Sequence, residues 1–102
     1  MKSERKIALK VDEKDNVATV FSLGVSAGDE IEVRDCTNGV HRTFVHSAIL
    51  YGHKIAVREI PSAAHIIKYG EVIGVASENI HEGDHVHIHN MKALRGRGDL
   101  NA

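Results

Sequence analysis

A short pattern that recurs three times limits what this 102-residue chain can fold into. Each copy has an apolar residue, two further residues, a small residue, two further residues and a second apolar residue. The copies are Val25–Ile31, Ile60–Ile66 and Ile80–Val86, with Gly28, Ala63 and Gly83 as the small residues. A small residue, above all glycine, tolerates the positive φ of a tight turn, so each copy predicts a turn that leads into a strand. Such units predict a small, irregular all-β barrel or clip, and their uneven spacing argues against a regular repeat array.

Short apolar segments predict the strands of this barrel. The first is Lys6–Val11, whose odd-numbered apolar residues share one face. Asn38-Gly39 is typical of a two-residue hairpin turn and predicts that Val40–Val45 folds back onto Ile31–Asp35. The remaining strands are expected at Ile55–Val57 (with one wet face), Ile66–Tyr69, Val72–Ala76 and His85–His89.

One or two short helical turns are expected beside the strands. Asp15 is a suitable N-cap residue for a helix over residues 16–23. Val17, Val20 and Phe21 have near-helical spacing in that segment, although valine is β-branched and favours strands.

Composition indicates one domain with an aliphatic core. Hydrophobic residues make up 42% of the chain and aromatic residues 4%. The 13 basic and 14 acidic residues nearly cancel, which argues against a nucleic-acid-binding protein that relies on bulk charge. No segment is apolar and long enough to span a membrane, and the single cysteine, Cys36, suits a reducing cytoplasm. We expect flexible ends at residues 1–6 and 93–102 around a folded domain at 7–92.

Three of the eight histidines alternate with β-branched residues near the carboxyl end. On a strand, His85, His87 and His89 would share one face, while Val86 and Ile88 would enter the core. Such a row of imidazoles can bind a metal ion, move protons or hold an anion. The alternative is a polar strand face whose histidines are simply hydrogen bonded.

Two further groups are candidates for substrate contact. Gly52 precedes His53 and Lys54, and a glycine allows close approach of the backbone to an anion, while lysine supplies a compact charge for a carboxylate. Lys68 and Tyr69 offer a similar combination. The plain alternative is a set of surface lysines, a turn histidine and a tyrosine with its ring in the core. Asn90 follows the histidine row and is placed to fix one imidazole.

Three motifs together carry a family resemblance. Gly52-His53-Lys54, the segment Ile67–Gly74 and the segment Gly83–Asn90 occur in this order. They resemble the amino-terminal SAF-type domain of altronate and galactarate dehydratases, and the small subunit of sulfolactate sulfo-lyase is similar too. The resemblance covers residues 7–92 and implies a β-clip fold. The long second part of the full-length dehydratases has no counterpart in this chain.

The resemblance also implies a reaction, the removal of water from a sugar acid to give a 2-keto-3-deoxy acid. We therefore expect a small lyase subunit that is inactive without a separate large catalytic subunit, and a fragment of a longer enzyme is the alternative. The implied catalytic residues are His53, Lys54 and Lys68, the implied substrate-binding residues are Gly52, Tyr69 and Asn90, and the implied metal ligands are His85, His87 and His89. The metal would be iron or manganese, shared with the large subunit. The alternative function is a non-catalytic binding module for an acidic carbohydrate, and exposed strand edges leave a homo-oligomer open.

Overall fold

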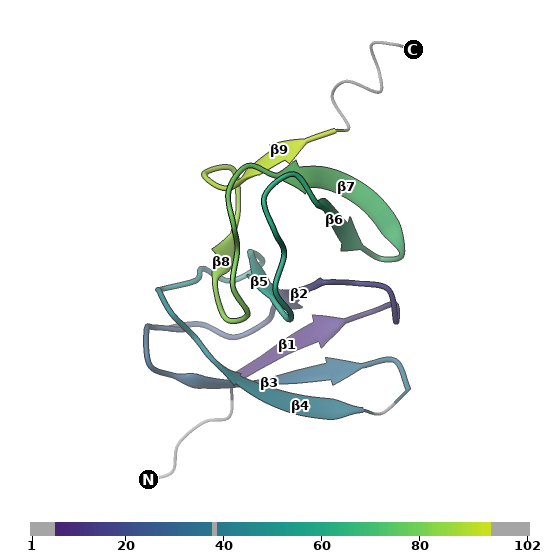
Figure 1. The fold of residues 1–102 in the computed structure, drawn as a ribbon. Coiled ribbons are helices and arrows are strands. Elements are labelled where there is room, and N and C mark those ends of the chain that lie inside the picture. Colours follow the sequence, from purple (N-terminus) through teal and green to yellow (C-terminus); the bar gives the residue numbers. More distant parts are fainter. Residues whose placement is uncertain (1–5, 38, 95–102) are drawn as a thin grey trace, which may run out of the picture.

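The computed structural model describes residues 6–37 and 39–94, and in these residues all regular structure is β-strand (Figure 1). The strands are β1 (Lys6–Lys10), β2 (Val17–Val20), β3 (Glu30–Asp35), β4 (Val40–Phe44), β5 (Lys54–Ala56), β6 (His65–Lys68), β7 (Glu71–Ala76), β8 (His85–Val86) and β9 (Met91–Ala93). Six of them form a sheet in the order β4-β3-β1-β2-β5-β8, and β6-β7-β9 form a second sheet. The all-β clip expected from the sequence is therefore confirmed.

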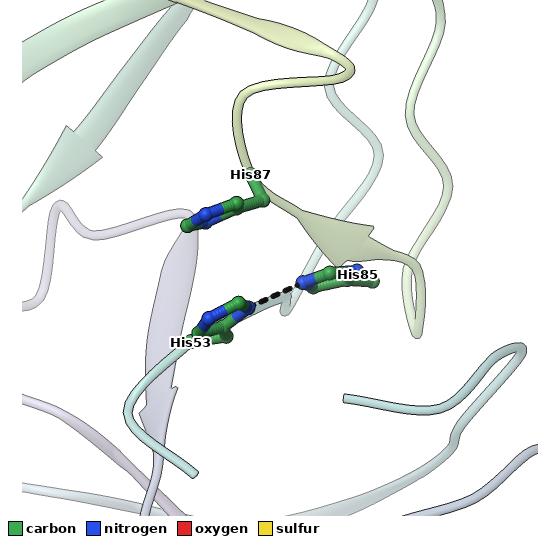
Figure 2. Close-up of side chains that lie close together, drawn as sticks. All are labelled: His53, His85 and His87. Carbon is green, nitrogen blue, oxygen red and sulfur yellow. Dashed lines mark hydrogen bonds between the residues drawn. The ribbon is translucent and has the colours of Figure 1, made fainter. Parts of the chain in front are cut away.

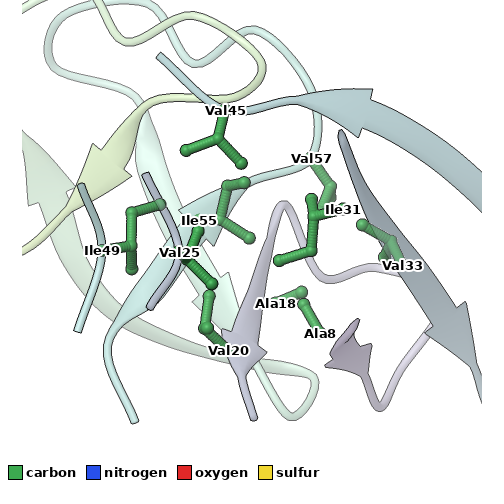
Figure 3. Packing of buried hydrophobic residues seen from close by; sticks show 10 residues of the cluster. All are labelled: Ala8, Ala18, Val20, Val25, Ile31, Val33, Val45, Ile49, Ile55 and Val57. Atoms are coloured by element: carbon green, nitrogen blue, oxygen red, sulfur yellow. The ribbon is translucent and has the colours of Figure 1, made fainter. Parts of the chain in front are cut away.

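Strand β2 lies between two hydrophobic cores and shares both with β5. The antiparallel register sets Val17 opposite Ala56 and Ala18 opposite Ile55. Neighbouring pairs point to opposite faces, so Ala18 and Ile55 enter one core (Figure 3), whereas Val17 and Ala56 enter the other. The expected wet face of residues 55–57 is therefore wrong, because both faces of β5 are covered.

The three copies of the sequence pattern form three equivalent turns. Gly28, Ala63 and Gly83 have φ values of 91°, 74° and 95°. Each turn is closed by one backbone hydrogen bond of 2.9–3.0 Å. The donor N–H groups belong to Asp29, Ala64 and Asp84, and the acceptor carbonyls to Ser26, Pro61 and His81, respectively. The apolar residues that flank each turn are buried, in agreement with the prediction.

The helix predicted after Asp15 is wrong, because residues 17–20 form strand β2. Asp15 is instead a buried carboxylate that joins two turns. Its Oδ2 accepts the N–H groups of Val11 and Asp12, and its Oδ1 accepts the N–H of Gly70 at 2.8 Å. The β-branched residues after it complete a strand with both faces buried, which outweighs their helical spacing.

The first strand and the hairpin are confirmed with one change of face. The sequence pattern placed the odd-numbered apolar residues of β1 together on one face. In the structure the buried residue is the even-numbered Ala8, whereas the odd-numbered Leu9 is exposed. β3 and β4 pair antiparallel as predicted, and Asn38 lies outside the described residues. Of the expected flexible ends, residues 1–5 and 95–102 also lie outside them, whereas Lys6 and Ala93 belong to strands. Over the described residues, no helix has the length and apolarity needed to cross a membrane.

Candidate functional site: a histidine triad

The imidazoles of His53, His85 and His87 converge at the edge of the six-stranded sheet (Figure 2). One nitrogen from each ring lies within 4.8 Å of the others. His53 Nδ1 and His85 Nε2 are hydrogen bonded at 2.9 Å, and the rings of His53 and His87 stack with centroids 4.0 Å apart. We call these three residues the histidine triad.

A bulge in the chain before β5 positions His53. Gly52 donates its N–H to the carbonyl of Val20, and Val20 donates its N–H to the carbonyl of His53. Two residues therefore lie opposite one, and Gly52 has the positive φ, 86°, that a glycine bulge requires. Bulges of this kind re-aim side chains, and here His53 points across the sheet edge toward β8.

The side-chain amide of Asn90 holds the backbone that carries the other two histidines. Its Oδ1 accepts the N–H of His87 at 3.0 Å, and its Nδ2 donates to the carbonyl of His85 at 2.9 Å. Asn90 is buried, so these bonds are shielded from water. We expected Asn90 to fix an imidazole, and it fixes the peptide backbone instead.

The predicted strand over residues 85–89 is wrong in its second half. β8 ends at Val86, and the chain turns through the next residues because Asn90 closes a loop back onto His85. Ile88 therefore faces solvent, with 81% of its surface exposed, instead of entering the core. His89 tilts against His85 with ring centroids 5.1 Å apart, but the nitrogens that converge belong to His53, His85 and His87.

The surroundings of His85 and His87 favour neutral imidazoles. Burial, with the nearby His89, His53, His87 and Lys54, lowers the pKa of His85 to about 4. Burial and the nearby His53, Lys54 and His89 also lower the pKa of His87. At neutral pH both rings are therefore uncharged, which is the form that binds a metal ion or accepts a proton.

Lys54 lies next to His53 in sequence but on the other face of the sheet. Lys54 is paired with Val86, which belongs to the same core as Val17 and Ala56. His85 is paired with Ile55, which belongs to the core that contains Ala18. Burial and the charge of Lys68 lower the pKa of Lys54. Its charge is still close enough to act on His85 and His87, as their pKa values show.

Lys68 and Tyr69 lie at the turn between β6 and β7, on the opposite side of the view from β8 (Figure 1). The ammonium group of Lys68 lies 4.9 Å from the centre of the Tyr69 ring. Tyr69 is half exposed and has a φ of 58°, a backbone conformation that residues other than glycine rarely adopt. Neither residue is therefore part of the triad, although Lys68 lies close enough to Lys54 for its charge to act there.

Comparison with known proteins agrees with this structure. Residues 6–94 match the family model described as the altronate/galactarate dehydratase SAF domain. The chain belongs to this family.

Two curated relatives show how such SAF domains occur. The chain is 37% identical over 86 residues to the (2R)-sulfolactate sulfo-lyase subunit alpha of Chromohalobacter salexigens, covering 82% of this chain and 90% of that protein. It is 34% identical over 84 residues to the altronate dehydratase of Escherichia coli, covering 82% of this chain but only 16% of that protein. This SAF domain is thus similar both to a named subunit and to a small part of a long enzyme.

The donor set of this SAF domain fits a divalent metal ion. Three neutral imidazole nitrogens are a common ligand set for first-row transition metals. Nδ1 of His87 is buried and has no hydrogen-bond partner among the described residues, so a ligand would satisfy it. The rings of His53 and His87 stack with centroids 4.0 Å apart, so one of them would have to rotate before all three histidines could hold the same ion.

Sequence reasoning missed the contacts that hold the turn before β8. Nδ1 of His46 lies 2.8 Å from Oδ1 of Asp84, and Oδ2 of Asp84 accepts the N–H of His81 at 2.8 Å. Nδ1 of His81 lies 2.8 Å from Oε1 of Glu59, which raises the pKa of His81. In the sequence only Asp84, which follows Gly83 in the third copy of the pattern, points to these contacts. Its partner His46, and Glu59, which contacts His81, are distant along the chain.

Proposed function

We propose that this SAF domain is the small, histidine-bearing part of a lyase that removes water from a sugar acid of the altronate or galactarate type. The product would be a 2-keto-3-deoxy acid, and a larger catalytic chain would supply the remaining groups. The family and its lyase relatives support the reaction class. The observation that carries the proposal is the convergence of His53, His85 and His87.

Dehydration next to a carboxylate makes three chemical demands. A base takes the proton at C2, an electrophile stabilises the enolate that forms, and an acid protonates the hydroxyl that leaves from C3. In our proposal the triad holds an iron or manganese ion at the boundary with the catalytic chain. Such an ion supplies Lewis acidity toward the carboxylate and the developing enolate.

The residues of this chain then have distinct roles. His85 and His87 remain neutral at pH 7 and are available as ligands. His53 is the third metal ligand, in place of His89. When no ion is bound, His53 exchanges a proton with the substrate. Gly52 keeps the bulge that aims His53, and Asn90 keeps the loop that aims His87.

The lysines are proposed to attract the carboxylate. Neither Lys54 nor Lys68 forms an ion pair with another described residue. Lys54 is the lysine whose charge reaches the triad, because it contributes to the lowered pKa values of His85 and His87. Lys68 adds its charge near Lys54, whereas Tyr69, at the β6–β7 turn, contacts the substrate only if the catalytic chain brings it there.

The test is a pull-down with the tagged chain from its own cell extract, followed by assay of the eluate on altronate, galactarate and sulfolactate. We expect a large co-purifying chain, loss of water from a sugar acid, and no turnover by the small chain alone. His53→Ala and His87→Ala should abolish the activity of the complex, whereas His41→Ala, at an exposed histidine outside the triad, should not.

Three results would point elsewhere. Sulfite release from sulfolactate without dehydration would keep the lyase class but change the substrate. Binding of a sugar acid with neither partner nor turnover would favour the binding module. Turnover by the small chain alone would contradict the need for a catalytic chain.

A further inference from the structure

The segment that aims His53 exposes four large apolar side chains. Residues 21–25 and 49–53 run antiparallel, with Val25 bridged to Ile49 and Gly52 bonded to Val20. The exposed side chains on them are Leu23 (78% exposed), Leu50 (68%), Tyr51 (55%) and Phe21 (38%). The rings of Phe21 and Tyr51 meet edge to face with centroids 5.9 Å apart. We call these four residues the apolar ribbon.

The composition of this ribbon is that of an interface. Residues 21–25 and 49–53 contain no Asp, Glu, Lys or Arg, although these make up 26% of the chain. Contiguous apolar surface with aromatic residues and little charge is typical of the centre of a protein–protein contact.

The ribbon is continuous with the histidine triad. His53 is the last residue of the segment 49–53, which carries Leu50 and Tyr51 of the ribbon. Its carbonyl oxygen accepts the N–H of Val20. Ile88, which follows His87 in sequence, is also 81% exposed. A chain that covered the triad would therefore also meet exposed apolar side chains next to His53 and His87 in sequence.

The triad leaves no imidazole free to act as base or acid once all three hold an ion. It contains three histidines and no carboxylate. The E. coli altronate dehydratase extends far beyond the 16% of its length that this chain matches, and the sulfo-lyase relative is named as one subunit. In our proposal the catalytic chain supplies the base and the acid when it approaches the triad.

We propose that the apolar ribbon is the docking surface for the catalytic chain of the lyase, which meets it with an apolar face and closes over the histidine triad. This inference rests on the proposed function, because it assigns a place to the partner named there. Closure would exclude water from the triad and strengthen the electrostatic interactions inside it.

The chain offers a matched control at the start of β4. Val40 is also a large apolar side chain that is half exposed, but it belongs to β4, whereas the triad lies at the edge formed by β8. β4 and β8 are the two outer strands of the six-stranded sheet (Figure 1). The end of β4, at Phe44, contacts the turn before β8, whereas Val40 lies at the other end of the strand.

The experiment uses the chain that co-purifies with the wild-type protein and carries the elimination activity. We expect Leu50→Asp and Leu23→Asp each to weaken its binding by at least about tenfold, because each buries an unpaired charge in the contact. Val40→Asp should change the affinity by less than about twofold. Hydrogen exchange on the wild-type complex should slow at residues 21–25 and 49–53 and not at Val40.

The possible failures are distinguishable. Wild-type affinity in Leu50→Asp and Leu23→Asp, without exchange protection of the ribbon, would overturn the docking surface and leave the proposed function intact. A dimer of the small chain alone that Leu50→Asp dissociates in sedimentation would identify a second copy as the occupant and also overturn it. Recovery of neither a catalytic chain nor elimination activity would remove the proposed function together with this inference.

Discussion

Gly83 lies directly against the backbone of Phe44, with no room for a side chain between them. A β-carbon at position 83 would overlap the carbonyl oxygen of Phe44 and crowd the imidazole of His46. The N–H of His46 donates to the carbonyl of Gly83 at 3.0 Å, which holds the two segments together. This contact fixes the turn that leads directly into His85 and His87.

Gly83→Ala should therefore be much more destabilising than Gly28→Ala. The two glycines occupy equivalent turns with φ values of 95° and 91°, but a β-carbon at Gly28 would meet no atom within 4 Å. We expect a loss of about 1 kcal/mol for Gly28→Ala from φ alone. Overlap with Phe44 should add about 1–3 kcal/mol for Gly83→Ala. Urea unfolding measures both, and equal losses would contradict the close contact.

Asp15→Ala should destabilise the fold by about 2–4 kcal/mol, because three backbone N–H groups lose a charged acceptor. Glu13→Ala, at an exposed site in the same turn, should change the free energy of unfolding by less than about 0.5 kcal/mol. Thermal and urea unfolding measure the difference. A loss at Asp15 no larger than at Glu13 would show that this carboxylate does not hold the turn.

Replacement of Tyr69 separates backbone strain from side-chain contacts. Tyr69→Asn and Tyr69→Ala both remove the ring and its contact with Lys68. Asparagine tolerates the observed φ of 58° better than alanine does. We expect Tyr69→Asn to be more stable than Tyr69→Ala by about 0.5–1 kcal/mol. Equal stabilities would indicate that the turn relaxes when the ring is removed.

The metal-free protein should lose stability in mild acid. The pKa of His85 is about 4 in the fold, below its ordinary value of 6.5, so the unfolded chain binds more protons between these pH values. Stability from this residue is complete above about pH 6.5 and declines as the pH falls toward 4. The raised pKa of His81 beside Glu59 acts in the opposite direction.

His85→Gln isolates the first effect. Urea unfolding at pH 7 and at pH 5, in the presence of a chelator, should show a smaller loss of stability for the variant than for the wild-type protein. The same loss in both proteins would contradict a destabilised charged form of His85.

Local sequence chemistry predicted the turns, whereas long-range pairing decided the site. The positive φ at Gly28, Ala63 and Gly83 follows from residues within each turn. His53 joins His85 only through the pairing of β5 with β8, across 32 residues of sequence, so a row of alternating histidines gave no sign of it. Asp15 has the residue type of a helix cap, but its partner Gly70 is 55 residues away.

The central claim is that His53, and not His89, completes the triad with His85 and His87. Titration of the purified, chelator-treated protein with Co²⁺, followed by absorption and calorimetry, tests it directly. We predict one ion per chain, with an affinity about 10- to 100-fold weaker in His53→Ala and within about threefold of wild type in His89→Ala. Loss of the ion in His89→Ala with wild-type affinity in His53→Ala would contradict the account.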